Sequence, residues 1–218
     1  MADESKIKEI QEYLDGLKNP RDTIDIMGLR NLEKLSKVEY HDLIDETTYL
    51  DFIQSGDYHY FVSRTLFHFS IDHYSFFAAQ QCVENYLKAY LRFQNQIPPN
   101  WHLLPELLVE CRKVSAASDA FINSDHCETM VRKYNPYNEL ARYPIQKIRP
   151  QDGSFGVLRP LDIWILDYFV FCMRQIMPVP TDDWNIMEPD GHQYLQCCGY
   201  DHPDILKRFM DGNINFGR

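Results

Sequence analysis

The stretch from Ser75 to Gln94, SFFAAQQCVENYLKAYLRFQ, constrains the fold more than any other part of the chain. Its apolar residues recur with a period of about 3.5, which is typical of a helix that buries one face. The stripe consists of Phe76, Ala79, Val83, Tyr86, Leu87 and Tyr90. We expect this helix to begin near Ile71 and to end at QIPPN, because proline removes a backbone donor and fixes φ. One long helix therefore contributes its apolar face to a core.

The same helix carries two other groups of residues. Ala78, Ala79 and Cys82 are small, so a second helix can approach closely there. The polar residues are Gln80, Gln81, Glu84, Asn85 and Lys88. The i,i+4 pair of Glu84 and Lys88 is typical of a solvated surface, but so compact a polar set also suits a partner or a ligand. We predict that this set lies at a groove or at a dimer seam.

The composition favours an all-α protein. The 218 residues are 44% apolar and 25% charged, as in ordinary globular chains, and glycine occurs only 9 times. Few glycines and long stretches without turn signals favour helices over a sandwich or a barrel. We predict an antiparallel up-down bundle of four to five helices at residues 55–177, with an N-terminal helical extension at 1–54 and a C-terminal tail at 178–218.

Helical periodicity and turn residues predict the individual elements. Helices are expected at about 4–17, 22–37, 55–69, 102–114, 117–134, 160–177 and 203–210, with 38–54 irregular. Pro105 falls in the first turn of its helix, where a missing N–H is harmless, and Pro136 ends the next one. An Asp-Gly pair favours a tight turn, so the segment 145–158 is either a small hairpin or a loop.

The chain is acidic, with a net charge of −10, so a nucleic-acid site must be a local basic patch. Residues 132–159 hold six Lys/Arg and two acidic residues, a local balance of +4. This segment is either an accident of loop composition or an anion site. Guanidinium groups match phosphate bidentately, and Tyr134, Tyr137 and Tyr143 are candidates for stacking on a base. The candidate ligand-binding residues are Arg132, Lys133, Tyr137, Asn138, Arg142, Tyr143, Lys147 and Arg149.

The sequence also predicts a cytoplasmic location without membrane contact. The start MADESKIKEI is charged and lacks an apolar core, so no secretory signal is expected. The most apolar run, 161–173, is too short for a bilayer and is interrupted by Asp162 and Asp167. The six cysteines lie mostly in apolar helical patterns, which favours reduced, buried thiols over disulfides.

Metal and nucleophile motifs give no support for a catalytic centre. His59, His68 and His73 lie near Asp57 and Asp72 along the chain, but a lone histidine on a packed helix is usually a core or surface residue. The tail HQYLQCCGYDH offers Cys and His, yet adjacent cysteines at this spacing match no common zinc knuckle. The chain has no G-x-S-x-G, P-loop or G-x-G-x-x-G motif. We predict no metal and no cofactor.

Three short patterns follow one another along residues 58–145. Phe77, Gln81, Glu84, Leu87, Lys88 and Ala89 come first, with Asn85 at a position where Lys is usual; His102, Leu104 and Leu107 come next; Arg142, Tyr143 and Pro144 come last. In this order they resemble the HEPN family. The members of that family are small α-helical bundles that occur with nucleotidyltransferase partners and in RNA-targeting toxins.

The resemblance also bears on catalysis. Ribonucleases of this family carry Arg, four to six residues, and then His, which handle proton transfer and phosphate charge. Here Asn138 follows Arg132 at the analogous spacing, and an amide does not shuttle protons near neutral pH. Arg64 and His68 are too close together and too early in the chain. The ribonuclease motif is therefore absent, which argues against an enzyme.

We predict a non-catalytic HEPN-like module that binds a nucleotide, an RNA or a protein partner through its basic segment. One alternative is a metal-independent ribonuclease toxin of a toxin–antitoxin or phage-defence system. Another is a structural or interaction protein without a ligand. The resemblance and the small residues at Ala78, Ala79 and Cys82 lead us to expect a homodimer, and the resemblance implies a nucleotidyltransferase-type protein partner.

Overall fold

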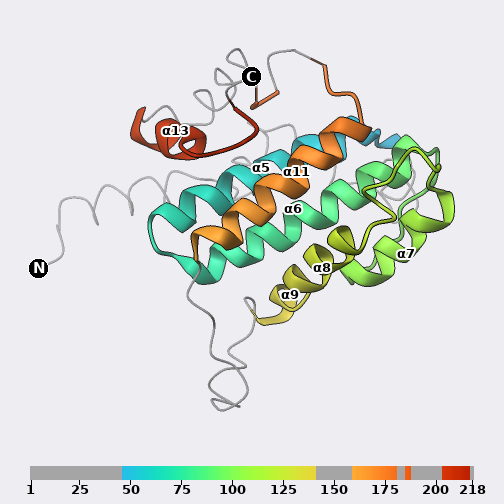
Figure 1. Cartoon of the computed structure of the whole chain (residues 1–218), viewed down its shortest axis with the longest axis horizontal. Helices are drawn as coiled ribbons and strands as arrows, with labels where there is room; N and C mark the ends of the chain where they lie inside the picture. Colours follow the sequence, from blue (N-terminus) through green and yellow to red (C-terminus); the bar gives the residue numbers. More distant parts are fainter. Residues whose placement is uncertain (1–45, 141–158, 181–184, 188–202, 217–218) are drawn as a thin grey trace, which may run out of the picture. The chain divides into compact units, whose positions relative to one another are not determined.

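The computed structural model describes residues 46–140, 159–180, 185–187 and 203–216 (Figure 1). From Thr48 onward they belong to one compact unit. The helices are α5 (Tyr49–His68), α6 (Asp72–Phe93), α7 (Leu104–Val114), α8 (Asp125–Tyr134), α9 (Tyr137–Leu140), α11 (Pro160–Ile176) and α13 (Pro203–Met210). These described residues contain no strand, which confirms the predicted all-α bundle. The expected helices at 4–17 and 22–37 and the expected hairpin at 145–158 lie outside the described residues.

Helices α5 and α6 form an antiparallel hairpin across the bundle (Figure 1). Helix α5 begins at Tyr49, six residues earlier than predicted, because Thr48 and Asp51 form a capping box. The Thr48 hydroxyl accepts from the Asp51 N–H at 3.3 Å, and the Asp51 carboxylate accepts from the Thr48 N–H at 2.7 Å. None of the described helices is long and apolar enough to cross a membrane.

Helix α6 is the central element, since it contacts α5, α7, α8, α9 and α11. The predicted apolar stripe is buried along its whole length. Ala78, Ala79 and Cys82 are buried too, so these small residues pack inside the chain. The hairpin is tight at Gly56 of α5, where an added Cβ would lie 2.8 Å from Cδ2 of Tyr86. A side chain at this position would therefore force α5 and α6 apart.

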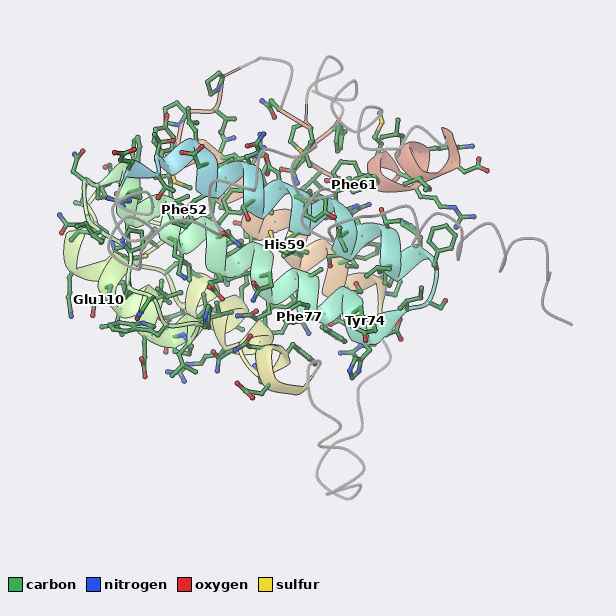
Figure 2. The ribbon with its side chains drawn as sticks, turned by 180° about the vertical axis from the view of Figure 1, so that it is seen from behind. Phe52, His59, Phe61, Tyr74, Phe77 and Glu110 are labelled. Carbon is green, nitrogen blue, oxygen red and sulfur yellow. The ribbon has the colours of Figure 1, made fainter. Side chains whose placement is uncertain are left out.

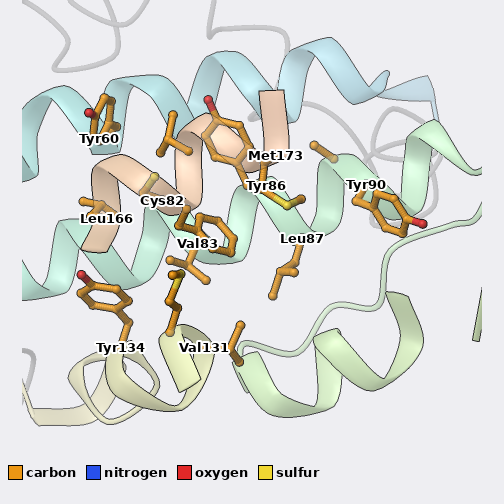
Figure 3. Close-up of a cluster of buried hydrophobic side chains, with 14 of the residues drawn as sticks. Tyr60, Cys82, Val83, Tyr86, Leu87, Tyr90, Val131, Tyr134, Leu166 and Met173 are labelled. Atoms are coloured by element: carbon orange, nitrogen blue, oxygen red, sulfur yellow. The ribbon is translucent and has the colours of Figure 1, made fainter. Parts of the chain in front are cut away.

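Four tyrosines of the described part of the chain are buried in the core, and the hydroxyl of each donates a hydrogen bond (Figure 3). Tyr60 donates to Asp167 at 2.6 Å, Tyr90 to Asp119 at 2.5 Å, Tyr86 to Asp57, and Tyr134 to the backbone carbonyl of Asp162 at 2.5 Å. A buried polar group without a partner costs about 1–3 kcal/mol. These pairings therefore favour one register between the helices that they join.

Two buried ion pairs connect α5 to α11. Asp57 pairs with Arg174, and Arg64 pairs with Asp167. The Arg64 guanidinium also donates to the backbone carbonyl of Phe209 at 2.9 Å, which fixes α13 against α5. Arg64 is thus fully engaged within the fold.

The predicted helix at 117–134 is shorter than expected, because α8 begins only at Asp125. The preceding residues form turns around Asp119, whose carboxylate accepts from the Tyr90 hydroxyl at 2.5 Å and from the Ala116 N–H at 3.2 Å. Ser124 then caps α8 by accepting from a backbone N–H. Short polar side chains that bond to nearby backbone favour turns over helix, which explains the difference.

Candidate functional site

The polar residues of α6 divide into a buried and an accessible group. Gln80 is fully buried and Glu84 is 3% exposed, whereas Gln81, Asn85 and Lys88 are half-buried. Two of the five side chains therefore lie in the interior, and the other three border on solvent.

Glu84 is the centre of this polar cluster. Its Oε1 accepts from Lys88 Nζ at 2.9 Å and lies 2.7 Å from His102 Nδ1. Its Oε2 accepts from the side-chain amides of Gln80 at 3.2 Å and Gln81 at 3.4 Å. A buried carboxylate is costly without such donors, so the cluster compensates the burial of Glu84.

His102 connects this cluster to the surface. Its side chain is 55% exposed even though Nδ1 contacts the buried carboxylate. Its backbone carbonyl accepts from the Gln80 amide at 3.4 Å, and two residues later the Leu104 N–H donates to Asn135 Oδ1 at 3.0 Å. The loop before α7 is therefore held to α6 on one side and to the turn after α8 on the other.

His59 is the second histidine near Glu84. It lies on α5, on the face of the molecule seen in Figure 2, and it is only partly exposed. Burial lowers the pKa of His59, and the negative charge of Glu84 partly opposes that shift. The His59 ring therefore favours its neutral form more than a solvated imidazole does.

The Glu84–His102 pair has a definite chemical capability. A carboxylate only accepts hydrogen bonds, so Nδ1 of His102 carries the hydrogen that points to Glu84. In the neutral ring the other nitrogen, Nε2, is then an acceptor, and in the protonated ring it is a cationic donor. An exposed imidazole fixed in this way can bind a hydroxyl or a phosphate oxygen.

The described cations of the predicted basic segment are engaged with carboxylates. Arg132 donates to Glu128 at 2.8 Å, with its side chain 66% exposed, and Arg112 of α7 donates to the other oxygen of Glu128 at 2.8 Å. These bonds, first from Arg112 and then from Arg132, lower the pKa of Glu128. Lys133 pairs with the buried Asp162 at 2.6 Å. Arg132 is thus the more accessible of the two predicted cations.

The remaining predicted residues have different surroundings. Tyr134 is buried in the core, so the expectation that it stacks on a ligand is wrong. Tyr137 stacks in parallel on Phe76, with ring centroids 4.0 Å apart, and Asn138 is 9% exposed. The other candidates, Arg142, Tyr143, Lys147 and Arg149, lie outside the described residues.

Sequence reasoning missed the contact between Glu84 and His102. Both residues belong to patterns that resembled the HEPN family, and the fixed order of those patterns was the available signal. The order of the patterns did not reveal the contact, because no sequence rule predicts which residue of a following loop packs against a given residue of a helix. Among the described residues, no group of three or more His, Cys, Asp or Glu is placed to hold a metal ion.

Comparison with protein-family models gives a match. The model of the HEPN domain family matches residues 49–157, which extends the resemblance seen in the sequence at both ends. Neither the curated proteins nor the solved structures contain a match to this chain. The matched region covers α5 to α9, including Glu84, His102 and Arg132. With half of its residues matched in this way, the chain belongs to the HEPN domain family.

Proposed function

We propose that this HEPN domain binds a nucleotide or an RNA and does not cleave it. One observation carries the proposal: Leu104, the first residue of α7 and two residues after His102, donates its N–H to Asn135, the residue directly after the cationic end of α8. The exposed imidazole of His102 and the exposed guanidinium of Arg132 therefore belong to two elements that are joined to each other. Both groups suit a phosphate.

Arg132 can exchange its present partner for a phosphate at little cost. Its ion pair with Glu128 is solvent-exposed, and such pairs contribute little to stability. A guanidinium–phosphate contact is bidentate and charge-assisted, and such hydrogen bonds contribute about 1.5–3 kcal/mol. In this proposal Arg142, Lys147 and Arg149 add further phosphate contacts.

Asn138 supports binding without turnover. It occupies the position, six residues after Arg132, where ribonucleases of the family carry histidine. It is nearly buried, and an amide neither accepts nor releases a proton near neutral pH. Arg132 therefore lacks, at this position, the histidine that transfers protons in the ribonucleases of the family.

The test is a titration of labelled single-stranded RNA and of mononucleotides at low and at high salt. We expect binding that weakens with salt, because phosphate contacts release counterions. Arg132→Ala should lower the affinity by about 10- to 100-fold, the scale of a charge-assisted pair. Lys207→Ala, which removes an exposed lysine of α13, is the matched control and should change little. If the wild-type protein binds no RNA and no nucleotide at low salt, the proposal fails.

A second candidate function is metal-independent RNA cleavage, and the Glu84–His102 pair is the observation that favours it. A carboxylate that orients a histidine is a common arrangement for general acid–base catalysis. Under the binding proposal, RNA incubated with the protein and EDTA stays intact over hours. Cleavage that disappears in both His102→Ala and Arg132→Ala would favour the ribonuclease instead.

We also propose that the chain forms a homodimer. Ala78, Ala79 and Cys82 are buried within the chain, so in this proposal the dimer interface uses other residues. Helix α11 exposes an apolar stripe with i, i+3, i+7 spacing, made of Leu161, Trp164 and Tyr168, which suits a second copy. Light scattering should give about twice the chain mass of 25.9 kDa, and Trp164→Glu should restore that mass to one chain.

We also propose a protein partner of the nucleotidyltransferase type. The ground for this proposal is the resemblance to the HEPN family. Co-purification with a nucleotidyltransferase encoded beside this chain is the direct test. A mixture that elutes as two separate species at micromolar concentrations would argue against that partner.

A further inference from the structure

A separate cavity lies beyond the Glu84 cluster, where α6 ends and α7 packs against it. It has a volume of about 410 Å³, which falls in the range of small-molecule sites. Its lining includes Leu91 of α6 and Val114 of α7, the loop residues Ile97 and Trp101, and the charged residues Glu110 and Lys113 of α7. Apolar walls and a few polar groups are thus combined in one cavity.

The loop that forms this cavity is held in shape by its backbone. Asn95 adopts a left-handed conformation, with φ 58°, directly after the end of α6. Its N–H donates to the Arg92 carbonyl at 2.9 Å, and the Gln96 N–H donates to the Leu91 carbonyl at 2.8 Å, the two bonds of a Schellman motif. Two prolines follow at 98 and 99, and each fixes its own φ. The cavity therefore exists before a ligand binds.

The side chains of the cavity suit a flat ligand with a polar edge. Trp101 is 42% exposed, so its indole is available for stacking. Glu110 and Lys113 form an ion pair at 2.7 Å whose side chains are 35% and 61% exposed, and such a pair is easily exchanged. Glu110 can accept from an amine, and Lys113 can donate to a carbonyl or a phosphate.

The position of the cavity connects it to the Glu84 cluster. Leu91 follows Glu84 by seven residues, so the two lie on one face of α6, on the order of 10 Å apart along the helix axis. A short nucleotide strand can reach both places. A purely apolar side chain of a protein partner would use the walls of the cavity but not the charged rim.

We propose that this cavity holds one nucleobase, with Trp101 stacked on its face and Glu110 accepting from its exocyclic amine. The inference rests on the proposed function, because it names the part of the nucleotide that is recognised. It predicts a preference for adenine, guanine and cytosine over uracil, which has no exocyclic amine. Base stacking on an aromatic side chain is sequence-tolerant, so Trp101 supplies affinity and Glu110 supplies selectivity.

The experiment is a set of titrations with cytidine monophosphate, uridine monophosphate, ribose 5-phosphate and a short single-stranded RNA, followed by tryptophan fluorescence. In the wild-type protein, the base-containing ligands should quench fluorescence, and cytidine monophosphate should bind more tightly than uridine monophosphate. Trp101→Leu should weaken RNA binding by about 5- to 100-fold, and Trp101→Phe should restore most of it. Tyr74→Leu, at an exposed aromatic residue near the start of α6, is the control and should stay within twofold of wild type.

Selectivity is tested in Glu110→Gln, which should bind cytidine and uridine monophosphates with similar affinity. If RNA binds the wild type and Trp101→Leu equally well, or if ribose 5-phosphate binds as tightly as the nucleotides, the base site is overturned while the proposed function stands. If neither RNA nor nucleotide binds the wild type, both proposals fall together. Melting temperatures within about 2 °C of wild type show that the variants are folded, since a loss of 1 kcal/mol shifts the midpoint by about 2–4 °C in a chain of this length.

Discussion

Two regions of this protein bury carboxylates in different ways. In the α5–α11 seam, formed by Asp57, Arg174, Arg64 and Asp167, both members of each ion pair are nearly inaccessible. In the α6–α7 corner, formed by Glu84 and the loop that carries His102, only the carboxylate is buried. The α5–α11 seam is therefore nearly closed to solvent, whereas in the α6–α7 corner the His102 side chain is exposed to solvent.

The difference separates groups that only stabilise the fold from groups that solvent can reach. In the seam, burial raises the pKa of Asp57 and of Asp167, although each has an arginine partner that opposes the shift. The seam groups hold α5 against α11, and their side chains are at most 11% exposed, so they offer little surface to a ligand. His102 keeps one ring nitrogen for another partner. The corner is thus the region where a ligand can bind without disturbing the core.

The largest effect should come from breaking an ion pair of the seam. Asp57→Ala leaves the Arg174 guanidinium buried without its carboxylate and removes the acceptor of the Tyr86 hydroxyl. We expect a loss of about 3–5 kcal/mol in the free energy of unfolding, the usual cost of one uncompensated buried charge. Urea unfolding followed by circular dichroism measures it.

The control for that prediction is Asp57→Leu combined with Arg174→Met and Tyr86→Phe, which also removes the hydroxyl that would lose its partners. Replacing a buried polar group by apolar residues of similar volume is often neutral, so the triple variant should recover most of the loss. A single variant that unfolds within about 1 kcal/mol of wild type would show that the seam pair does not stabilise the fold, and the contrast with the corner would then disappear.

In the corner, the two partners should differ in their contributions. Glu84→Ala removes the acceptor of Lys88, Gln80 and Gln81, so we expect a loss of about 1–3 kcal/mol. His102→Ala should cost less than about 1 kcal/mol, because its side chain is largely in solvent. Thermal unfolding of both variants gives the comparison. Equal losses would mean that His102 serves the fold in the same way as Glu84.

A smaller effect concerns the two turns that flank α6. Ser70, at the end nearer α13, and Asn95, at the corner, both have left-handed backbones, with φ of 56° and 58°. Serine is strained there, whereas asparagine tolerates that region. Ser70→Gly should therefore stabilise the protein by about 0.5–1 kcal/mol, and Asn95→Gly should change it by less. An equal gain at both positions would show that the side chain at Asn95 is strained as well.

Most of the fold could be predicted from local pattern. The stripe of α6, the prolines beside it and the run at 160–177 gave helix bounds within a few residues of those observed. The sequence did not predict that Thr48 caps the start of α5. It also did not predict that Asp119 holds the residues just before α8 in turns instead of helix. Both errors have the same cause, because short polar side chains bind backbone groups whose conformation is not visible in periodicity.

The site was less predictable than the fold. The basic segment follows from charge alone, but charge does not show that Lys133 pairs with Asp162 or that Tyr137 stacks on Phe76. The corner depends on contacts between α6 and a loop 18 residues away along the chain. Such contacts are set by how the loop packs, and a single sequence contains no direct signal of them.

The smallest predicted effect is the pH dependence of stability that arises from His59, which lies near Glu84 of the corner. Burial lowers the pKa of His59, and Glu84 only partly opposes this shift. The unfolded chain therefore binds a proton at His59 more readily than the folded protein does, below the usual histidine pKa of about 6.5. Stability is lost as pH falls through that value, and His59→Gln should remove this contribution. Urea midpoints at about pH 7.5 and 5.5 should differ less in His59→Gln than in wild type. The opposite outcome is a His59→Gln protein that loses as much stability on acidification as wild type. It would show that His59 is solvated in the folded protein, as His102 is, and not enclosed like the ion pairs of the α5–α11 seam.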